Sequence, residues 1–313
     1  MKTAVRWGSA THQGRIRDHN EDAVLAGPQV FAVADGMGGH AGGAVASALT
    51  VATLASAVGH DPTTGTVRAA LAQSNAAIVD RGVVQGTPGM GSTVAGIAPT
   101  GEEGIVVFSV GDSRVYRRRD DAFDQLTDDD SVVAELVRDG TLTEAEARSR
   151  PDRNVITKAL GVDDEIDPQI FEIERHSGDV FVIASDGLFT EVSDATIASV
   201  VGEPSSEDHR ARKLMDLALE HGGRDNISVV VVTVIETTDI EDLSEDTNPS
   251  PIRLTEISVP DVSSESAPPL ITSAPVAPPE VTPRPSPVGR SSLIDSVPAS
   301  IEPDDDHQQD QSG

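Results

Sequence analysis

Apolar runs and segments of helical periodicity alternate along the first 236 residues of the chain. Five short runs rich in Val, Ile and Phe are typical of strands buried in a sheet, and they cover residues 30–34, 104–110, 114–118, 179–184 and 227–235. Apolar residues recur at helical spacing over residues 42–58, 66–81, 131–139, 143–149, 194–200 and 206–221. Because helices come in pairs between groups of strands, this order predicts a mixed α+β sandwich rather than a regular βαβ winding.

Two short patterns refine this prediction. Thr143 and Glu146 have the spacing of a capping box, which favours a helix start at this point. Gly111-Asp112-Ser113 separates two of the apolar runs. A turn of this composition predicts a hairpin-like connection, so we expect the sheet to be at least partly antiparallel.

Residues 41–59 contain no charge and are long enough to be considered as a membrane span. Their composition is mostly Ala, Gly, Ser and Thr, and this hydropathy is too weak for a span. We therefore expect a small-residue helix packed inside a soluble core. The N-terminal residues carry charges without the apolar stretch of a secretory signal. Since the chain also ends without an apolar span, we expect a cytoplasmic protein with no membrane span.

The composition changes abruptly after residue 236. Residues 237–313 contain 13 of the 20 prolines, 15 acidic residues against three arginines, and none of the eight aromatic residues. Such a segment cannot bury enough apolar surface to offset its chain entropy. We therefore expect one globular domain over residues 1–236 and a disordered tail, rich in Pro, Ser and acidic residues, over residues 237–313.

The chain is strongly acidic and contains no cysteine. Its 313 residues include 23 Lys and Arg against 52 Asp and Glu, which gives a net charge of −29. Phosphate backbones repel such a chain, so we expect no nucleic-acid partner. The absence of cysteine excludes disulfide scaffolds, Cys-ligated zinc, iron–sulfur clusters and cysteine nucleophiles. The chemistry must therefore use oxygen ligands, His, Ser or Thr, or a bound metal.

Four aspartates lie in Gly-containing turns at the end or start of apolar runs: Asp35, Asp112, Asp186 and Asp225. In antiparallel neighbours the exit of one strand lies beside the start of the next, so Asp35, Asp186 and Asp225 can converge on one sheet edge. Carboxylates that share a site repel one another unless a cation compensates them, and Mg²⁺ and Mn²⁺ prefer oxygen ligands. Each position alone is ordinary turn chemistry, but together they predict a metal site. The many glycines after Asp35 indicate close backbone approach to an ion or a phosphate.

Seven segments, taken in order, resemble the motifs of the metal-dependent protein phosphatases of the PP2C (PPM) family. They read GRIRDHNED at 14–22, VADGMGGH at 33–40, GMGST at 89–93, VGDSR at 110–114, RNVITKALG at 153–161, ASDGL at 184–188 and GGRDNIS at 222–228. The resemblance covers about residues 3–236 and is greatest to compact bacterial members, which act on phosphoserine and phosphothreonine proteins. It implies an α-β-β-α sandwich, in which two antiparallel β-sheets are flanked by helix pairs.

The resemblance also implies a set of metal ligands for two Mn²⁺ or Mg²⁺ ions. By that resemblance, Asp35 bridges the two ions and the backbone carbonyl of Gly36 completes one of them. Asp186 and Asp225 hold the other ion, and Asp22 reaches the same centre through a water. Many bacterial members bind a third ion, which implies a further site at Asp112 shared with Asp186.

The implied activity is hydrolysis of phosphoserine and phosphothreonine on proteins. A water that bridges the two ions attacks phosphorus directly, and no covalent phosphoenzyme forms. Arg17 matches the arginine that binds the substrate phosphate, a task suited to a planar guanidinium. On its position alone, Arg17 would be assigned to a surface salt bridge. Phosphorylated proteins are then the substrates, a serine/threonine kinase is the functional counterpart, and we expect a monomer.

The chain departs from the family pattern at three places. Met37 stands where many eukaryotic members have a histidine that protonates the leaving group, so this role passes to a metal-bound water or to His40. Asp130 stands where bacterial relatives usually have histidine in an Asp-His-Ser sequence, and Arg150 stands where they often have histidine before proline. The last two departures lie in the flap, the segment that contributes to substrate choice and to the third ion.

Two other functions fit the sequence less well. A catalytically idle member of the family would bind phosphoproteins as a regulatory module, but the metal positions of the chain are intact. A structural Ca²⁺-binding domain would need a D-x-[DN]-x-[DN]-G loop with a distant Glu. No such loop occurs, even at Asp128-Asp129-Asp130.

Overall fold

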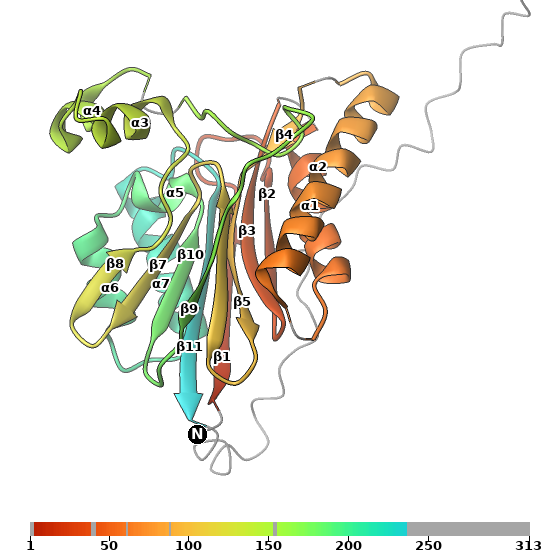
Figure 1. The fold of residues 1–313 in the computed structure, drawn as a ribbon. Coiled ribbons are helices and arrows are strands. Elements are labelled where there is room, and N and C mark those ends of the chain that lie inside the picture. Colours follow the sequence, from red (N-terminus) through yellow and green to blue (C-terminus); the bar gives the residue numbers. More distant parts are fainter. Residues whose placement is uncertain (1–2, 39–41, 61, 88, 153–154, 237–313) are drawn as a thin grey trace, which may run out of the picture. The chain divides into compact units, whose positions relative to one another are not determined.

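The computed structural model describes residues 3–38, 42–60, 62–87, 89–152 and 155–236. Within these ranges, eleven strands form two antiparallel sheets (Figure 1). The first sheet has the order β1 (Thr3–His12), β11 (Ile227–Glu236), β10 (Val180–Ala184), β7 (Arg114–Arg119) and β8 (Ala122–Gln125). The second has the order β2 (Asp22–Gly27), β3 (Val30–Met37), β5 (Val94–Thr100), β6 (Gly104–Val110) and β9 (Gln169–Glu174), with β4 (Gly91–Ser92) paired to β3.

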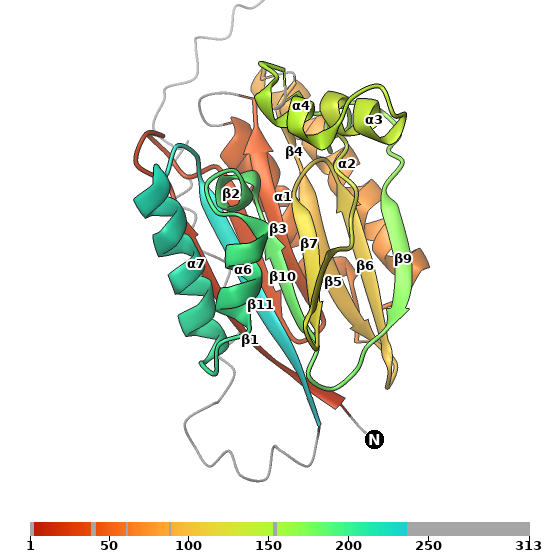
Figure 2. The same ribbon diagram turned by 90° about the vertical axis from the view of Figure 1, so that its left-hand side faces the viewer.

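Helices cover the outer face of each sheet, as Figures 1 and 2 show from two directions. The second sheet packs against α1 (Gly42–Ala57) and α2 (Thr64–Gln85). The first sheet packs against α5 (Asp186–Phe189), α6 (Asp194–Val201) and α7 (Glu207–His221). Two short helices, α3 (Val132–Arg138) and α4 (Glu144–Ser149), lie in the connection from β8 to β9. We call this connection, residues 126–168, the flap.

The core has three layers of apolar side chains, which follow from the two-residue period of the strands. In β3, Phe31 and Val33 point between the sheets, whereas Ala32 and Ala34 point toward α1 and α2. In β10, Phe181 and Ile183 point between the sheets, and Val182 and its alternating neighbours point toward the helices. The expected α-β-β-α sandwich of two antiparallel sheets is therefore confirmed.

The prediction of a hairpin at Gly111-Asp112-Ser113 is wrong. β6 pairs with β5 and β9, whereas β7 pairs with β10 and β8, so this turn carries the chain from one sheet to the other. Gly111 has a φ of +98°, and a Cβ there would lie 2.7 Å from Cγ2 of Thr93. A side chain at Gly111 would therefore collide with Thr93. The turn places Asp112 where the chain passes from one sheet to the other.

The uncharged segment forms α1, which packs through small residues as expected. Its buried residues are Gly42, Gly43, Ala46, Ser47, Thr50, Val51 and Leu54. None of the helices in the described ranges combines the length and the hydropathy that a membrane crossing requires. The predicted tail, residues 237–313, lies outside the described residues, as does His40.

Candidate metal centre

Four aspartates at strand ends converge at one end of the sandwich: Asp22 and Asp35 in the second sheet, and Asp186 and Asp225 beside strands of the first. We call these four, together with Asp112 at the corner, the strand-end acids. The register of β2 and β3 places Asp22 directly opposite Asp35. Asp186 follows β10 and Asp225 precedes β11, and these two strands are neighbours in the other sheet. The prediction of a single sheet edge is therefore wrong, because β3 belongs to one sheet while β10 and β11 belong to the other. The convergence itself is present.

A hydroxyl connects the two sheets at this point. The Ser185 Oγ, from the end of β10, donates to Oδ2 of Asp22 at 2.8 Å. The same Oγ accepts from the backbone N–H of Ser228 at 3.0 Å. Asp22 is only 4 % exposed. Its carboxylate is therefore oriented by the opposite sheet as well as by its own strand.

Burial and mutual repulsion keep these carboxyl groups from ionising easily. Burial raises the pKa of Asp22 and of Asp186 to about 7 and that of Asp112 to about 6. Burial also raises the pKa of Asp35 well above its usual range, and the charges of the other strand-end acids raise it further. A group of acids in this state requires a positive charge to be stable when ionised.

The donor atoms fit a hard divalent cation. Two buried carboxylate oxygens, Oδ1 of Asp22 and Oδ1 of Asp186, have no hydrogen-bond partner. Unpaired buried oxygens are costly in a folded protein, and a bound cation satisfies them. Across the described ranges, no three Asp, Glu or His side chains approach closely enough to form a complete ion-binding set. The side chains point to other partners instead, Asp225 to Arg17 and Asp22 to Ser185.

Arg17 lies at the rim of this cluster. Its Nη2 donates to Oδ2 of Asp225 at 2.6 Å, and its side chain is 52 % exposed. The hydrogen bond to Asp225 raises the pKa of Arg17, and the charges of Asp35 and Asp186 add to this. One guanidinium thus contacts the acidic cluster and remains open to solvent.

The loop that carries Arg17 is fixed to the start of β11. The Arg15 backbone N–H donates to the carbonyl of Gly223 at 2.7 Å. The Asn226 side chain donates to the carbonyls of Gln13 and His19 and accepts from the backbone N–H of Glu21. These contacts hold the loop on both sides of Arg17, so the guanidinium projects from a firmly placed backbone.

The structure gives Gly36 a packing role. A Cβ at Gly36 would lie 2.1 Å from the carbonyl oxygen of Gly43, so only glycine allows α1 to touch the end of β3. The Gly36 N–H donates to the carbonyl of Glu21 at 3.2 Å. At least part of the glycine content after Asp35 therefore serves close helix packing. Met37 is the last residue of β3, three residues beyond the predicted apolar run, and His40 lies outside the described residues.

The flap is attached to this end of the sandwich through its acidic residues. Asp130, the departure from the family pattern, is buried and accepts from the Gly111 N–H at 3.2 Å, and Lys158 Nζ lies 3.4 Å from its other oxygen. Arg150 donates twice to Asp152, at 2.7 and 2.8 Å. Asp130 thus fixes the start of the flap next to the corner that carries Asp112.

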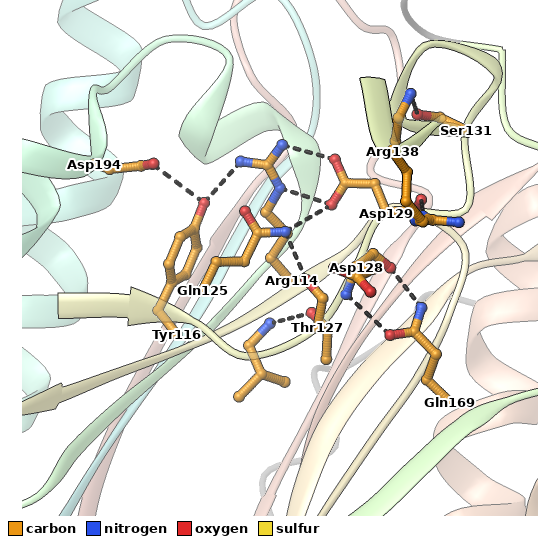
Figure 3. Close-up of polar contacts among 12 residues, drawn as sticks. Arg114, Tyr116, Gln125, Thr127, Asp128, Asp129, Ser131, Arg138, Gln169 and Asp194 are labelled. Carbon is orange, nitrogen blue, oxygen red and sulfur yellow. Dashed lines mark hydrogen bonds and ion pairs between the residues drawn. The ribbon is translucent and has the colours of Figure 1, made fainter. Parts of the chain in front are cut away.

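Sequence reasoning missed Arg114, which joins the flap to the first sheet (Figure 3). Its guanidinium donates to both oxygens of Asp129, at 2.9 and 2.7 Å, and to the hydroxyl of Tyr116 at 2.9 Å. The Tyr116 hydroxyl in turn donates to Asp194. The Arg114 Cζ lies 3.8 Å from the centre of the Phe189 ring in α5. The sequence did offer one signal for Arg114, because it lies two residues after Asp112 in the VGDSR segment.

Comparison with known proteins agrees with this geometry. A family model described as "Protein phosphatase 2C" matches residues 11–219. The serine/threonine protein phosphatase PstP of Mycobacterium tuberculosis is 39% identical over 238 residues, which cover 74% of this chain and 45% of that protein. The chain thus spans less than half the length of that relative. The protein phosphatase PhpP of Streptococcus pneumoniae is 34% identical over 237 residues, covering 72% of this chain and 96% of that protein.

Solved structures show the same fold. The crystal structure of the Mycobacterium tuberculosis serine/threonine phosphatase PstP/Ppp has a TM-score of 0.71 at 38% identity, covering 74% of this chain and 100% of that one. The catalytic domain of PstP in complex with two manganese ions has a TM-score of 0.69 at 36% identity, covering 75% of this chain and 100% of that one.

Proposed function

The chain belongs to the protein phosphatase 2C family, and from that premise we propose that it is a metal-dependent phosphatase acting on phosphoserine and phosphothreonine in proteins. The observation that carries this proposal is the buried cluster of strand-end acids with Arg17 at its rim. The names of the mycobacterial and streptococcal relatives support the reaction class. A serine/threonine kinase is then the functional counterpart.

Two Mn²⁺ or Mg²⁺ ions are proposed as cofactors, in line with the two manganese ions of the PstP structure. Asp35, the Gly36 carbonyl, Asp186 and Asp225 would hold them, with Asp22 close by. Asp112 with Asp186 would hold a third ion. When bound, such ions supply a strongly nucleophilic water near neutral pH and offset the charge of the phosphoryl oxygens.

The residues of the chain have distinct tasks in this proposal. Arg17 binds the phosphate through the donors of its guanidinium that face solvent. The hydrogen bond to Asp225 orients this guanidinium. Ser185 holds Asp22 in place by its hydrogen bond across the sheets. Met37 cannot donate a proton, so the leaving group would take its proton from His40 or from water at the metal centre.

The remaining expectations stay predictions as well. We propose residues 1–236 as the catalytic domain, supported by the family match over residues 11–219 and by the two sheets that end with β11. The assignment of residues 237–313 as a tail, the monomeric state, the cytoplasmic location and the lack of a nucleic-acid partner rest on the sequence alone.

The test is phosphate release from a phosphothreonine peptide, measured with Mn²⁺ and with a chelator. We expect turnover that requires the metal and that Asp186→Asn removes. Asp216→Asn, an exposed position on α7, is the matched control and should behave as wild type. Protein that binds Mn²⁺ and the phosphopeptide without turnover would instead be a phosphoprotein-binding module, and the proposed activity would be wrong.

A further inference from the structure

Glu191 is a buried carboxylate that has no task in binding the ions or the phosphate. It lies just beyond α5, the helix that Asp186 begins, and its side chain is 2 % exposed. The Arg224 side chain, which is 70 % exposed, donates from Nε to Oε1 and from Nη2 to Oε2, both at 2.8 Å. The backbone N–H of Arg224 also donates to Oε1, at 3.3 Å. One carboxylate therefore holds the side chain and the backbone of the residue that precedes Asp225.

The same two segments touch through their backbones. A Cβ at Gly187, next to Asp186, would lie 2.0 Å from the carbonyl oxygen of Asn226, next to Asp225. A Cβ at Gly222 would lie 3.1 Å from both carboxylate oxygens of Glu191, so the loop closes tightly over this group. The Glu191–Arg224 pair thus joins the segment that carries Asp186 to the loop that carries Asp225.

Charge explains why such a join is needed. Asp186 and Asp225 lie at the same end of the sandwich, and two carboxylates repel each other when both are ionised. Asp186 begins a helix, but Asp225 stands in a loop, so Asp225 is the acid that such repulsion would displace. The Glu191–Arg224 pair opposes the displacement, because separating the pair would leave a buried carboxylate without its cation.

We propose that Glu191 and Arg224 are positioning residues that hold Asp225 at the separation from Asp186 at which a divalent cation binds. The inference rests on the metal centre of the proposed function. Groups that orient ligands from behind a metal site typically change metal affinity by about 10- to 100-fold when they are removed. A positioning role therefore predicts weaker metal binding in a protein that is still folded.

The test is calorimetric titration of the chelator-treated protein, residues 1–313, with Mn²⁺, for wild type, Glu191→Gln and Arg224→Gln. The first variant keeps the size of the side chain but turns an amide N–H₂ toward the guanidinium. We expect the Kd for Mn²⁺ to rise about tenfold or more in both variants. The Mn²⁺ concentration that gives half-maximal phosphatase activity should rise by the same factor, while kcat at saturating Mn²⁺ stays within about twofold of wild type. The Kd of Arg224→Lys should lie between those of wild type and Arg224→Gln, because an ammonium keeps the charge but cannot form two parallel hydrogen bonds.

The matched control is Glu203→Gln. Glu203 accepts from Lys213 at 2.7 Å on both oxygens, beside the opposite end of α7, and should leave the Kd unchanged. Melting of the metal-free variants shows whether they fold. Folded Glu191→Gln and Arg224→Gln with the wild-type Kd, even at a lower melting temperature, would overturn the inference.

Wild type that binds Mn²⁺ but does not release phosphate would overturn the proposed function and leave the Kd comparison intact as a test of the pair. Wild type that does not bind Mn²⁺ would overturn both.

Discussion

Two sets of poorly exposed acids occupy this domain, and the chain pairs only one of them fully with arginines. In the arginine-paired acids, both carboxylate oxygens accept from one guanidinium at 2.7 to 2.9 Å; the pairs are Asp129 with Arg114, Asp179 with Arg119, and Glu191 with Arg224. Among the strand-end acids, Asp225 pairs with Arg17, but Asp22, Asp35 and Asp186 have no arginine partner within the described ranges, and burial raises the pKa of each. The chain can neutralise an acid when folding requires it. The strand-end acids therefore indicate a cation that comes from solution.

The largest effect should follow from removing one strand-end acid. We expect Asp35→Asn to lower phosphatase turnover by about 10³-fold or more, about 4 kcal/mol in the barrier, because ion binding fails. The same change removes repulsion, so the metal-free protein should melt at a higher temperature than wild type. Steady-state kinetics and calorimetric melting check the two parts. A variant that is inactive and, without metal, less stable than wild type would contradict the claim that Asp35 is repelled by the other strand-end acids.

The pH dependence of the metal-free protein should show the cost of ionising the buried strand-end acids. The pKa of Asp22 and Asp186 is about 7 in the folded protein and about 4 in an unfolded chain. The folded state therefore binds more protons between these values, and stability falls as the pH rises from about 4 to about 7.

One pKa unit corresponds to about 1.4 kcal/mol, so the metal-free protein should lose a few kcal/mol between pH 5 and pH 8. Urea unfolding at both pH values measures the loss. Asp22→Asn should reduce it, and Mn²⁺ at pH 8 should restore the stability. A metal-free protein that is equally stable at both pH values would show that ionising these buried acids carries no such cost.

An arginine-paired acid should behave in the opposite way. The Asp179 side chain is fully buried, binds both Nε and Nη2 of Arg119, and accepts from the His176 N–H. Asp179→Asn should therefore destabilise the protein by about 2 kcal/mol, with or without metal, because the Arg119 cation loses its partner. Urea unfolding measures this, and kcat for a small aryl phosphate should stay unchanged. A gain in stability would show that Arg119 does not neutralise Asp179, and the contrast with the strand-end acids would be wrong.

The smallest effect concerns the flap, where two neighbouring aspartates make a matched pair. Asp129 binds Arg114, whereas the exposed Asp128 meets Gln169 only through its backbone (Figure 3). Asp129→Asn should lower kcat/KM for a phosphopeptide a few-fold and leave an aryl phosphate nearly unaffected, since only the peptide is long enough to contact the flap. Asp128→Asn should change neither. If the two substitutions changed kcat/KM for the phosphopeptide equally, the Arg114–Asp129 pair would have no part in positioning the flap for the peptide.

The sequence predicts Asp35, Asp112, Asp186 and Asp225 because each lies beside a continuous apolar run, whereas Asp22 is identified only through the resemblance to the family motif. The same reasoning fails for β1, whose sequence TAVRWGSATH mixes polar and apolar residues, and for β9, which reads QIFEIE. Strands at the margins of a sheet need not be apolar throughout, so periodicity alone misses them. β1 forms a ten-residue ladder with β11, which only the paired structure reveals.

The partners of the arginines could not be predicted for a different reason. Arg119 and Asp179 are 60 residues apart, and Arg224 and Glu191 are 33 apart. A charged residue gives no local signal of which distant carboxylate it meets, because the pairing depends on sheet order. The turn at Gly111 is a second case in which local sequence is not enough. Its composition suits a hairpin, and a hairpin is excluded only because β6 and β7 pair with other strands.

The corner at Gly111 and the hydrogen bond from Ser185 to Asp22 bring acids from both sheets to one centre. An ion held there would cross-link two halves of the core that otherwise meet mainly through apolar contacts. Separating the sheets would then require releasing the ion. Amide hydrogen exchange should therefore slow together in β3 and β11 when Mn²⁺ is added, and the domain should open as one cooperative unit rather than as two layers.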